Sequence, residues 1–277
     1  MAWRPIGGVD FGRLREARLQ AHHAVQWLAR AARAFVPPHA DDRHTNLDWD
    51  DALGGFVTHP LKDDLRLGLC LTELRLTLVT PSVQVSFPLD GHTDADVRQR
   101  LGDLLAAHDL DPAPLDAKPP YEIADHKVAH GGAYDTGSLG DAFSGLAAWF
   151  ANADLSLGHV RDQMIAHKFA PSPVRTWPHH FDMATLTPLE TGGAEHARSV
   201  DAGFSPGDEH YGEPYFYVSP HPYPDVTKLS ALPLGRWHTQ GFTAAVLPAG
   251  SIVATNDSQA AGDAFLDAAV TAAITVL

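Results

Sequence analysis

The sequence has 277 residues, of which 44% are hydrophobic and 19% charged, which is the composition of a globular protein with enough chain for its own core. The formal net charge of −14 argues against nucleic acid as a partner, because neutralising phosphates needs a clustered basic face. The same charge argues against an anionic membrane surface.

Cysteine usage and the N-terminus indicate the compartment. Cys70 is the single cysteine and lies in an apolar run, so we expect a buried thiol in a reducing environment. The first residues lack the basic and apolar regions of a signal peptide, and no run reaches the roughly 18–20 apolar residues of a membrane span. We therefore expect a cytoplasmic protein with no membrane partner. The sequence carries no signal for its oligomeric state.

The first part of the chain alternates between helical and strand-like patterns. Apolar residues at steps of three and four predict a helix from Asp10 to Phe35, and Thr93 is a candidate N-cap for a helix from Asp94 to His108. Between them, period-two patterns and β-branched or leucine-rich runs predict four strands. These strands are expected at Gly55–Thr58, Leu65–Leu71, Glu73–Thr80 and Val83–Pro88.

The second part repeats this order after a segment, residues 111–140, that is rich in Pro, Gly, Asp and His. That segment is predicted to be a linker or an extended stretch that wraps the core. A helix is predicted from Gly140 to His167 and another from Ser258 to Leu277. The strands between them are expected at Val174–Trp177, Met183–Leu186, Arg198–Phe204, Tyr215–Val218 and Phe242–Val246.

These patterns predict an α+β fold with antiparallel sheets, built as two similar helix–strands–helix halves. The halves would be residues 1–110 and 141–277, joined by 111–140 in one compact unit, with a cleft between or beside them. Two local echoes suggest an internal duplication: residues 27–31 resemble 149–153, and 49–61 match 177–189 in length and ending. Chance similarity explains these echoes equally well.

One motif suggests a nucleophile and is excluded. Gly203-x-Ser205-x-Gly207 matches the nucleophile elbow of serine hydrolases. That elbow uses the backbone N–H of the residue after the serine, which here is Pro206 and has none. The stretch is better interpreted as a turn between strands in which Asp208 accepts hydrogen bonds from loop amides.

A metal site is one interpretation of the histidines and acids in the second half. Three converging ligands would suit Zn, Fe or Mn and leave a position open for water. The candidate ligands are His179, His180, Asp182, His210 and His238, with Glu213 and His221 nearby. Adjacent His179 and His180 would face opposite sides of a strand, and the spacing matches no compact zinc signature.

A small-molecule site is the other interpretation of the same region. Its predicted ligand-binding residues combine aromatic rings with carboxylates: Trp177, Asp182, Glu213, Tyr217 and Trp237. Asp182 and Glu213 are also the candidate general acid or base, because burial between bulky apolar groups would raise their pKa values. Capping loop amides or pairing with an arginine is the alternative role for both. No Gly-rich phosphate loop is present, so no nucleotide cofactor is expected.

Four stretches resemble a family of uncharacterised bacterial proteins: WPHHFD (177–182), GFSPGD (203–208), EPYFYV (213–218) and WHTQGFTAAVLP (237–248). Nearly the whole chain is similar, more distantly, to a broader bacterial domain family of unknown function. The resemblance implies no activity, cofactor or catalytic residue. In the distant family a Gly-Ser type pair stands at His179 and His180 and a Trp at Ser205, whereas Phe181-Asp182 and Glu213-Pro214 match.

Two functional hypotheses follow from the sequence. The first is a small-molecule-binding or structural protein with an aromatic and acidic cleft in its C-terminal half. The alternative is a metal-dependent enzyme, a hydrolase, that uses His179 or His180 with Asp182, His210 and His238.

Overall fold

In the computed structural model, residues 2–80, 84–190 and 197–277 are described, and they divide into two compact units. The N-terminal unit consists of Val9–Ala147 and Thr176–Phe181. The C-terminal unit consists of Met1–Gly8, Ala148–Arg175 and Asp182–Leu277. Residues 111–140, the predicted linker or wrapping segment, therefore lie wholly within the N-terminal unit.

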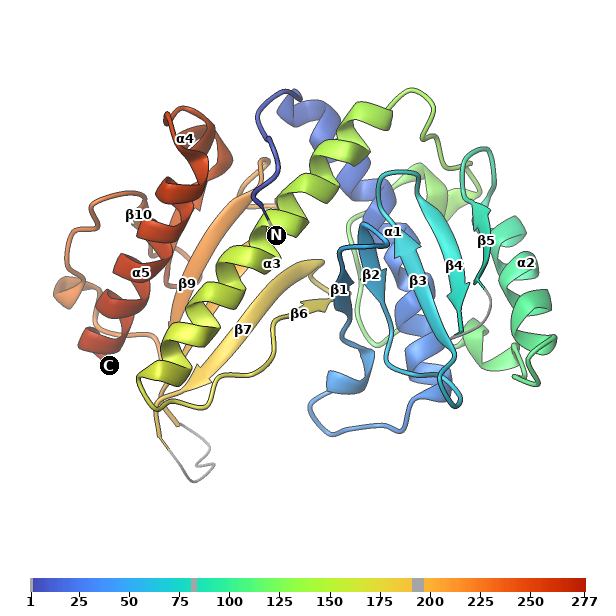
Figure 1. Cartoon of the computed structure of the whole chain (residues 1–277), viewed down its shortest axis with the longest axis horizontal. Coiled ribbons are helices and arrows are strands. Elements are labelled where there is room, and N and C mark those ends of the chain that lie inside the picture. The colour runs from blue at the N-terminus through green and yellow to red at the C-terminus, as the bar shows by residue number, and fades with distance from the viewer. Residues whose placement is uncertain (1, 81–83, 191–196) are drawn as a thin grey trace. The chain divides into compact units, whose positions relative to one another are not determined.

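The N-terminal unit contains a five-stranded antiparallel sheet of order β1-β2-β3-β4-β5 with the long helix α1 against one face (Figure 1). Its strands are β1 (Asp48–Asp50), β2 (Gly55–Val57), β3 (Arg66–Cys70), β4 (Arg75–Val79) and β5 (Gln84–Pro88). Each consecutive pair of strands is adjacent, so this sheet is a simple meander whose order follows the sequence.

Helix α1 (Phe11–Phe35) begins where Asp10 accepts hydrogen bonds from the amides of Gly12 and Arg13. Its apolar positions recur at helical spacing and are buried, among them Leu14, Ala21 and Leu28. The same buried side also carries polar residues, including Gln20, His23 and Gln26. Buried polar side chains require partners, and the segment after α2 supplies one to each of these three residues.

Helix α2 (Asp94–Ala106) starts with a capping box. The Thr93 hydroxyl accepts a hydrogen bond from the Asp96 amide, and the Asp96 carboxylate accepts one from the Thr93 amide. The predicted cap at Thr93 is therefore confirmed. The cap also fixes Asp94 as the first helical residue.

The segment after α2 is held against α1 by side-chain hydrogen bonds. His23 bonds the carbonyl of Ala124 at 3.0 Å, and the Tyr121 hydroxyl donates to Gln26 Oε1 at 2.9 Å. Further along, the Asp135 amide donates to Gln20 Oε1 at 2.8 Å. These bonds supply partners for three polar residues on the buried side of α1. They hold the segment after α2, whose sequence has no helical or strand period, against this helix.

The second sheet has six strands in the order β10-β11-β9-β8-β7-β6, and all of it belongs to the C-terminal unit except Thr176 and Trp177 of β6, which belong to the N-terminal unit. Its strands are β6 (Arg175–Trp177), β7 (Asp182–Pro188), β8 (Ser199–Ser205), β9 (Tyr215–His221), β10 (Arg236–His238) and β11 (Ala244–Pro248). The remaining helices are α3 (Gly140–Ala166), which begins in the N-terminal unit, α4 (Ala249–Val253) and α5 (Ser258–Val276).

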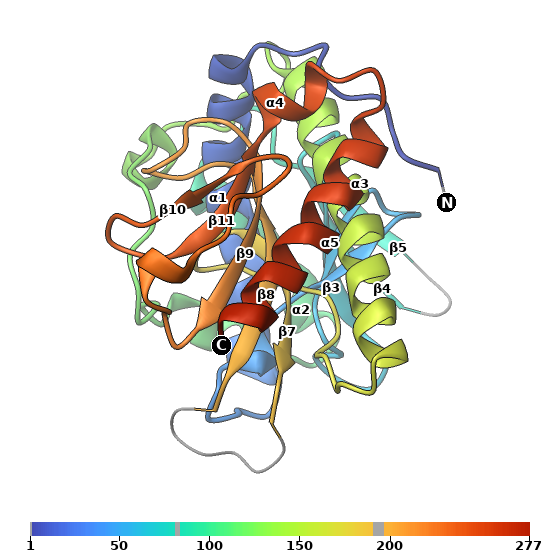
Figure 2. The same cartoon turned by 90° about the vertical axis from the view of Figure 1, so that its left-hand side faces the viewer.

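Helix α5 and the C-terminal part of α3 lie side by side on one face of this sheet (Figure 2). The core between them is centred on Phe204, which is fully buried and has ring contacts with Trp149, Phe150 and Phe216 at centroid distances of 5.2–6.0 Å. At Gly262, α5 comes so close that an added Cβ would lie 3.5 Å from the Phe216 ring. The opposite face, the polar face of β7, β8 and β9, carries Asp182, Asp201, Tyr217 and Ser219, whereas Thr185 and Thr187 lie on the Phe204 face and are buried there.

The predicted α+β class with two antiparallel sheets is confirmed, whereas an internal duplication is not. Three short elements, β1, β10 and α4, lie outside the predicted set. Cys70 is half-buried at the end of β3 and not fully buried as expected. Within the described residues, no helix is long and apolar enough to cross a membrane.

Candidate functional site

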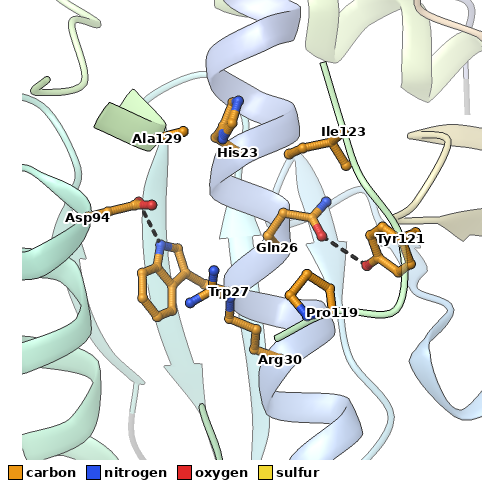
Figure 3. Close-up of a pocket in the computed structure, with 9 residues that line it drawn as sticks. All are labelled: His23, Gln26, Trp27, Arg30, Asp94, Pro119, Tyr121, Ile123 and Ala129. Carbon is orange, nitrogen blue, oxygen red and sulfur yellow. Dashed lines mark hydrogen bonds between the residues drawn. The ribbon is translucent and has the colours of Figure 1, made fainter. Parts of the chain in front are cut away.

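The N-terminal unit holds a pocket of about 210 Å³ beside α1 (Figure 3). Residues from α1, from the start of α2 and from the segment after α2 line it. They are His23, Gln26, Trp27, Arg30, Asp94, Pro119, Tyr121, Ile123 and Ala129.

Helix α1 supplies one continuous wall. His23, Gln26, Trp27 and Arg30 are spaced at three, four and seven residues, so they project from the same side of the helix. Trp27 is only 3% exposed, whereas Arg30 is half-buried, so the wall runs from the core toward the surface.

Trp27 and Asp94 form the floor where α1 meets the start of α2. The Trp27 indole N–H donates to Asp94 Oδ1 at 3.2 Å, and the hydroxyl of buried Tyr134 donates to the same oxygen at 2.8 Å. Burial, followed by the negative charge of Asp94, holds the pKa of Tyr134 well above its ordinary value, so this hydroxyl remains a donor. Asp94 is thus fixed by two donors on one oxygen.

Tyr121 closes the opposite side through Gln26. Its hydroxyl donates to Gln26 Oε1, while Gln26 Nε2 donates to the carbonyl of Pro178 at 2.8 Å and to that of His22 at 3.1 Å. Burial raises the pKa of Tyr121, so it remains a neutral phenol at physiological pH. This wall is therefore organised before any ligand enters.

His23 contributes no charge at neutral pH. Burial lowers its pKa, against the opposing effect of its hydrogen bond with the Ala124 carbonyl. With the ring neutral and one nitrogen occupied, Arg30 and Asp94 are the two charged residues that line the pocket.

Arg30 lies over the Trp27 ring with its guanidinium carbon 4.7 Å from the ring centroid. Its Nε is buried and has no hydrogen-bond partner among the described residues, and none of them forms an ion pair with it. An arginine in this setting has donor capacity left over on a planar fork that suits a carboxylate or a phosphate.

Of the residues predicted to bind a ligand, Asp182 and Tyr217 do meet. The Tyr217 hydroxyl donates to Asp182 Oδ2 at 2.6 Å on the polar face of β7, β8 and β9. Gly203, opposite Tyr217 in the sheet, leaves room for its ring, since an added Cβ would lie 2.3 Å from the phenol carbon. Burial and the charge of Asp182 raise the Tyr217 pKa, so this pair ties β7 to β9 with a neutral phenol.

Asp201 is a second acid on this face, and burial followed by the negative charge of Asp182 raises its pKa to about 6. A folded-state pKa above the ordinary 3.8 means that the native protein prefers the neutral carboxyl, so its stabilising effect is present below about pH 4 and is lost as the pH rises through 6. Asp201→Asn mimics the neutral form. We expect it to raise the free energy of unfolding by about 1–3 kcal/mol at pH 8 and to be near neutral at pH 4.

The measurement is urea unfolding of wild type and Asp201→Asn at the two pH values. Asp225→Asn is the matched control, because hydrogen bonds from Thr227 lower the pKa of exposed Asp225 and the effect should have the opposite sign. If Asp201→Asn changes the free energy of unfolding by the same amount at pH 4 and pH 8, the charge of Asp201 is not the cause.

The other predicted ligand-binding residues do not join Asp182. Trp237 pairs with Ala245 and Tyr217 with Val246, so these two aromatic residues lie on opposite faces of the sheet. The Trp237 indole donates to the Ser230 carbonyl at 2.8 Å. Trp177 belongs to the N-terminal unit, where its ring contacts His179.

Glu213 binds a backbone amide, which is the alternative to a catalytic role that the sequence offered. Its Oε2 accepts a hydrogen bond from the Gly250 amide at 2.6 Å, which fastens the loop before β9 to the start of α4. Asp208 likewise accepts from the amides of His210 and Tyr211, as predicted, and from the Tyr215 hydroxyl. Ser205 is buried and accepts from the Gly207 amide, which completes the predicted turn.

The candidate metal ligands do not gather in a group of three within the described residues. His179 and His180 lie in a turn with their ring centroids 4.2 Å apart, so the expectation that they face opposite sides of a strand is wrong. Burial, followed by the charge of His180, lowers the pKa of His179 to about 4.

His238 uses both ring nitrogens. Nδ1 lies 3.0 Å from the Tyr211 hydroxyl and Nε2 lies 2.7 Å from the Gln240 carbonyl. His210 contacts the rings of His238 and Phe242. In the described part of the chain, no group of three or more His, Cys, Asp or Glu side chains is placed to hold a metal ion, so the metal hypothesis gains no support.

No protein-family model matches the chain, and neither a curated protein nor a solved structure matches it. The resemblance of its motifs to uncharacterised bacterial proteins stays a prediction. The site must be judged on its own geometry.

The residues that line the pocket were missed in the sequence. Their signal is the presence of polar residues, Gln20, His23 and Gln26, on the buried side of an amphipathic helix. Such residues indicate that another polar segment packs there, and Arg30 follows one turn after Gln26 on the same side. The segment that supplies Tyr121 has no periodic pattern of its own.

Proposed function

We propose that this protein binds a small molecule in the pocket beside α1. The observation that carries the proposal is Arg30, which lines the pocket with its Nε buried and with no ion pair or hydrogen bond to a described residue. A partly buried cation with donors that no protein group uses offers those donors to an anionic ligand.

The volume limits the size of the ligand. About 210 Å³ is below the roughly 300–1,000 Å³ of pockets for drug-sized ligands. It exceeds the roughly 150 Å³ of a cavity that holds benzene. The proposed ligand is therefore on the scale of a single ring or a short-chain metabolite.

The composition of the pocket favours binding over covalent catalysis. Its nine lining residues include no Ser, Thr, Cys or Lys, and the other residues of nucleophilic type, His23, Asp94 and Tyr121, are each hydrogen-bonded to protein groups. They combine apolar Pro119 and Ile123 with a few fixed polar groups, which is the usual make-up of a recognition site. The single cysteine and acidic composition support our placing this binding protein in the cytoplasm.

The test is a ligand-detected NMR screen of small water-soluble molecules against the full chain. Ala129→Phe fills the pocket from an exposed position, and Ala106→Phe makes the same change at an exposed site outside the pocket. We expect molecules that bind wild type and Ala106→Phe but not Ala129→Phe. Equal binding to all three proteins, or no binding to any, would overturn the proposal.

A further inference from the structure

We propose that the ligand of this pocket is a small aminocarboxylate, whose carboxylate is bound by Arg30 and whose ammonium group is bound by Asp94. This inference rests on the proposed function and adds the chemical class of the ligand. It depends on three observations about these two side chains.

The first observation is that Arg30 lacks an anion. The Asp116 carboxylate, whose pKa is lowered first by Arg98 and also by Arg30, is held by Arg98 through both oxygens at 2.6 and 2.8 Å. Arg30 instead contacts the Trp27 ring, which orients the guanidinium without neutralising its charge. A ligand carboxylate would supply the planar, bidentate partner that this fork fits.

The second observation is that Asp94 is held through one oxygen only. Trp27 and Tyr134 both donate to Oδ1, and no described residue donates to Oδ2. Neither donor is charged, so neither neutralises the carboxylate, and its place in the first turn of α2 favours a negative charge. A carboxylate that is fixed on one oxygen and open on the other suits an ammonium group with its three donors.

The third observation is that Arg30 and Asp94 line the same pocket without forming an ion pair with each other. Trp27 lies between them: its ring face is under Arg30 and its N–H bonds Asp94 (Figure 3). The two opposite charges are thus held apart at fixed positions. A ligand with only a carboxylate would be repelled by Asp94, and one with only an ammonium group would be repelled by Arg30. A zwitterion with its carboxylate at Arg30 and its ammonium group at Asp94 is attracted by both.

The test uses isothermal titration calorimetry of the full chain with five probes. Glycine, β-alanine and 4-aminobutanoate carry both charges at increasing separation, and butanoate and butylamine carry one charge each. We expect at least one aminocarboxylate to bind about tenfold or more tightly than both single-charge probes. An aminocarboxylate makes two charge-assisted contacts, whereas butanoate and butylamine make one each.

Two variants assign the charges. Arg30→Gln should reduce the affinity of the best aminocarboxylate to about that of butylamine, and Asp94→Asn to about that of butanoate, each by roughly tenfold or more. The amide side chain introduced by Asp94→Asn keeps an oxygen acceptor for Trp27 and Tyr134, so the floor is preserved. Arg15→Gln removes an exposed charge from the same helix and should leave the affinity unchanged.

The outcomes separate this inference from the proposed function. Butanoate or butylamine binding as tightly as every aminocarboxylate would overturn the zwitterion and leave the pocket a binding site. If none of the five probes binds, but the screen finds molecules that bind wild type and not Ala129→Phe, the zwitterion is again overturned and the pocket remains a binding site. If aminocarboxylates bind Ala129→Phe as tightly as wild type, both the inference and the pocket are wrong.

Discussion

Replacing Gly55 by alanine is expected to lower the free energy of unfolding by about 3 kcal/mol or more, because an added Cβ overpacks a buried strand. Gly55 begins β2 and pairs with Asp50 on one side and Cys70 on the other. A Cβ there would lie 1.8 Å from the Leu69 carbonyl oxygen and 2.9 Å from the Cys70 Cα. Both are backbone atoms, so β2 and β3 would have to separate.

Gly54→Ala is the matched control, one residue away. Gly54 has a φ of +63° and nothing within 4 Å of an added Cβ, so alanine there meets left-handed backbone strain alone, about 1–2 kcal/mol. Urea unfolding followed by tryptophan fluorescence measures both variants. Equal losses at the two positions would mean that β2 and β3 are not so closely apposed at Gly55.

The sequence predicted most of the regular elements from their apolar residues, although strands such as β2 and β11 are buried at every position. In α1 the apolar steps of three and four gave both ends within one residue. In β4, Leu76 and Leu78 are buried as expected, but Thr77 between them is buried as well, so the middle of this strand is covered on both faces. β2 and β6 have three residues like β1 and β10 but were predicted, so length alone does not explain the misses. The sequences of β1 and β10, DWD and RWH, place a single Trp between charged or polar residues and lack an apolar or β-branched run.

Of the predicted ligand-binding residues, those brought together lie on one face of the C-terminal sheet, and strand alternation decides which they are. Tyr215 and Tyr217 lie on one face of β9 and Phe216 on the other, as alternation along a strand requires: Phe216 packs toward α5, whereas Tyr217 bonds Asp182. Trp237 was grouped with Tyr217 because both are aromatic and near in sequence. The register of β10 on β11 places it on the opposite face, and the register of an edge strand is not written in its own three residues.

The pocket depends on a contact that no local pattern contains. Asp94 and Trp27 are 67 residues apart, and Tyr121 and Gln26 are 95 apart. The sequence shows that α1 has polar residues among its apolar positions. Their partners lie in a segment whose apolar residues follow neither a helical nor a strand spacing, so the sequence does not predict the contact. Aromatic residues and histidines are concentrated in the C-terminal half, which is why the sequence predicted a site there. In the structure, these side chains largely contact each other and the loops.

Replacing Trp27 by alanine is expected to cost about 3–5 kcal/mol, the usual loss for a buried tryptophan. The change removes a side chain that is 3% exposed, takes a hydrogen-bond donor from Asp94 and leaves Arg30 without the ring beneath it. Trp27→Phe keeps an aromatic ring and loses the N–H, so its cost should be smaller, about 1–3 kcal/mol. Urea unfolding of the full chain gives both values.

The two variants also separate the structural role of Trp27 from its role in the pocket. If the ring positions Arg30, Trp27→Phe should keep most of the affinity for the best ligand, and Trp27→Ala should lose about tenfold or more even under conditions where it is folded. Near-ultraviolet circular dichroism checks the fold at the temperature of the titration. If Trp27→Ala binds the ligand as tightly as wild type, the Trp27 ring does not position the Arg30 guanidinium, and the indole contributes only to packing of the core.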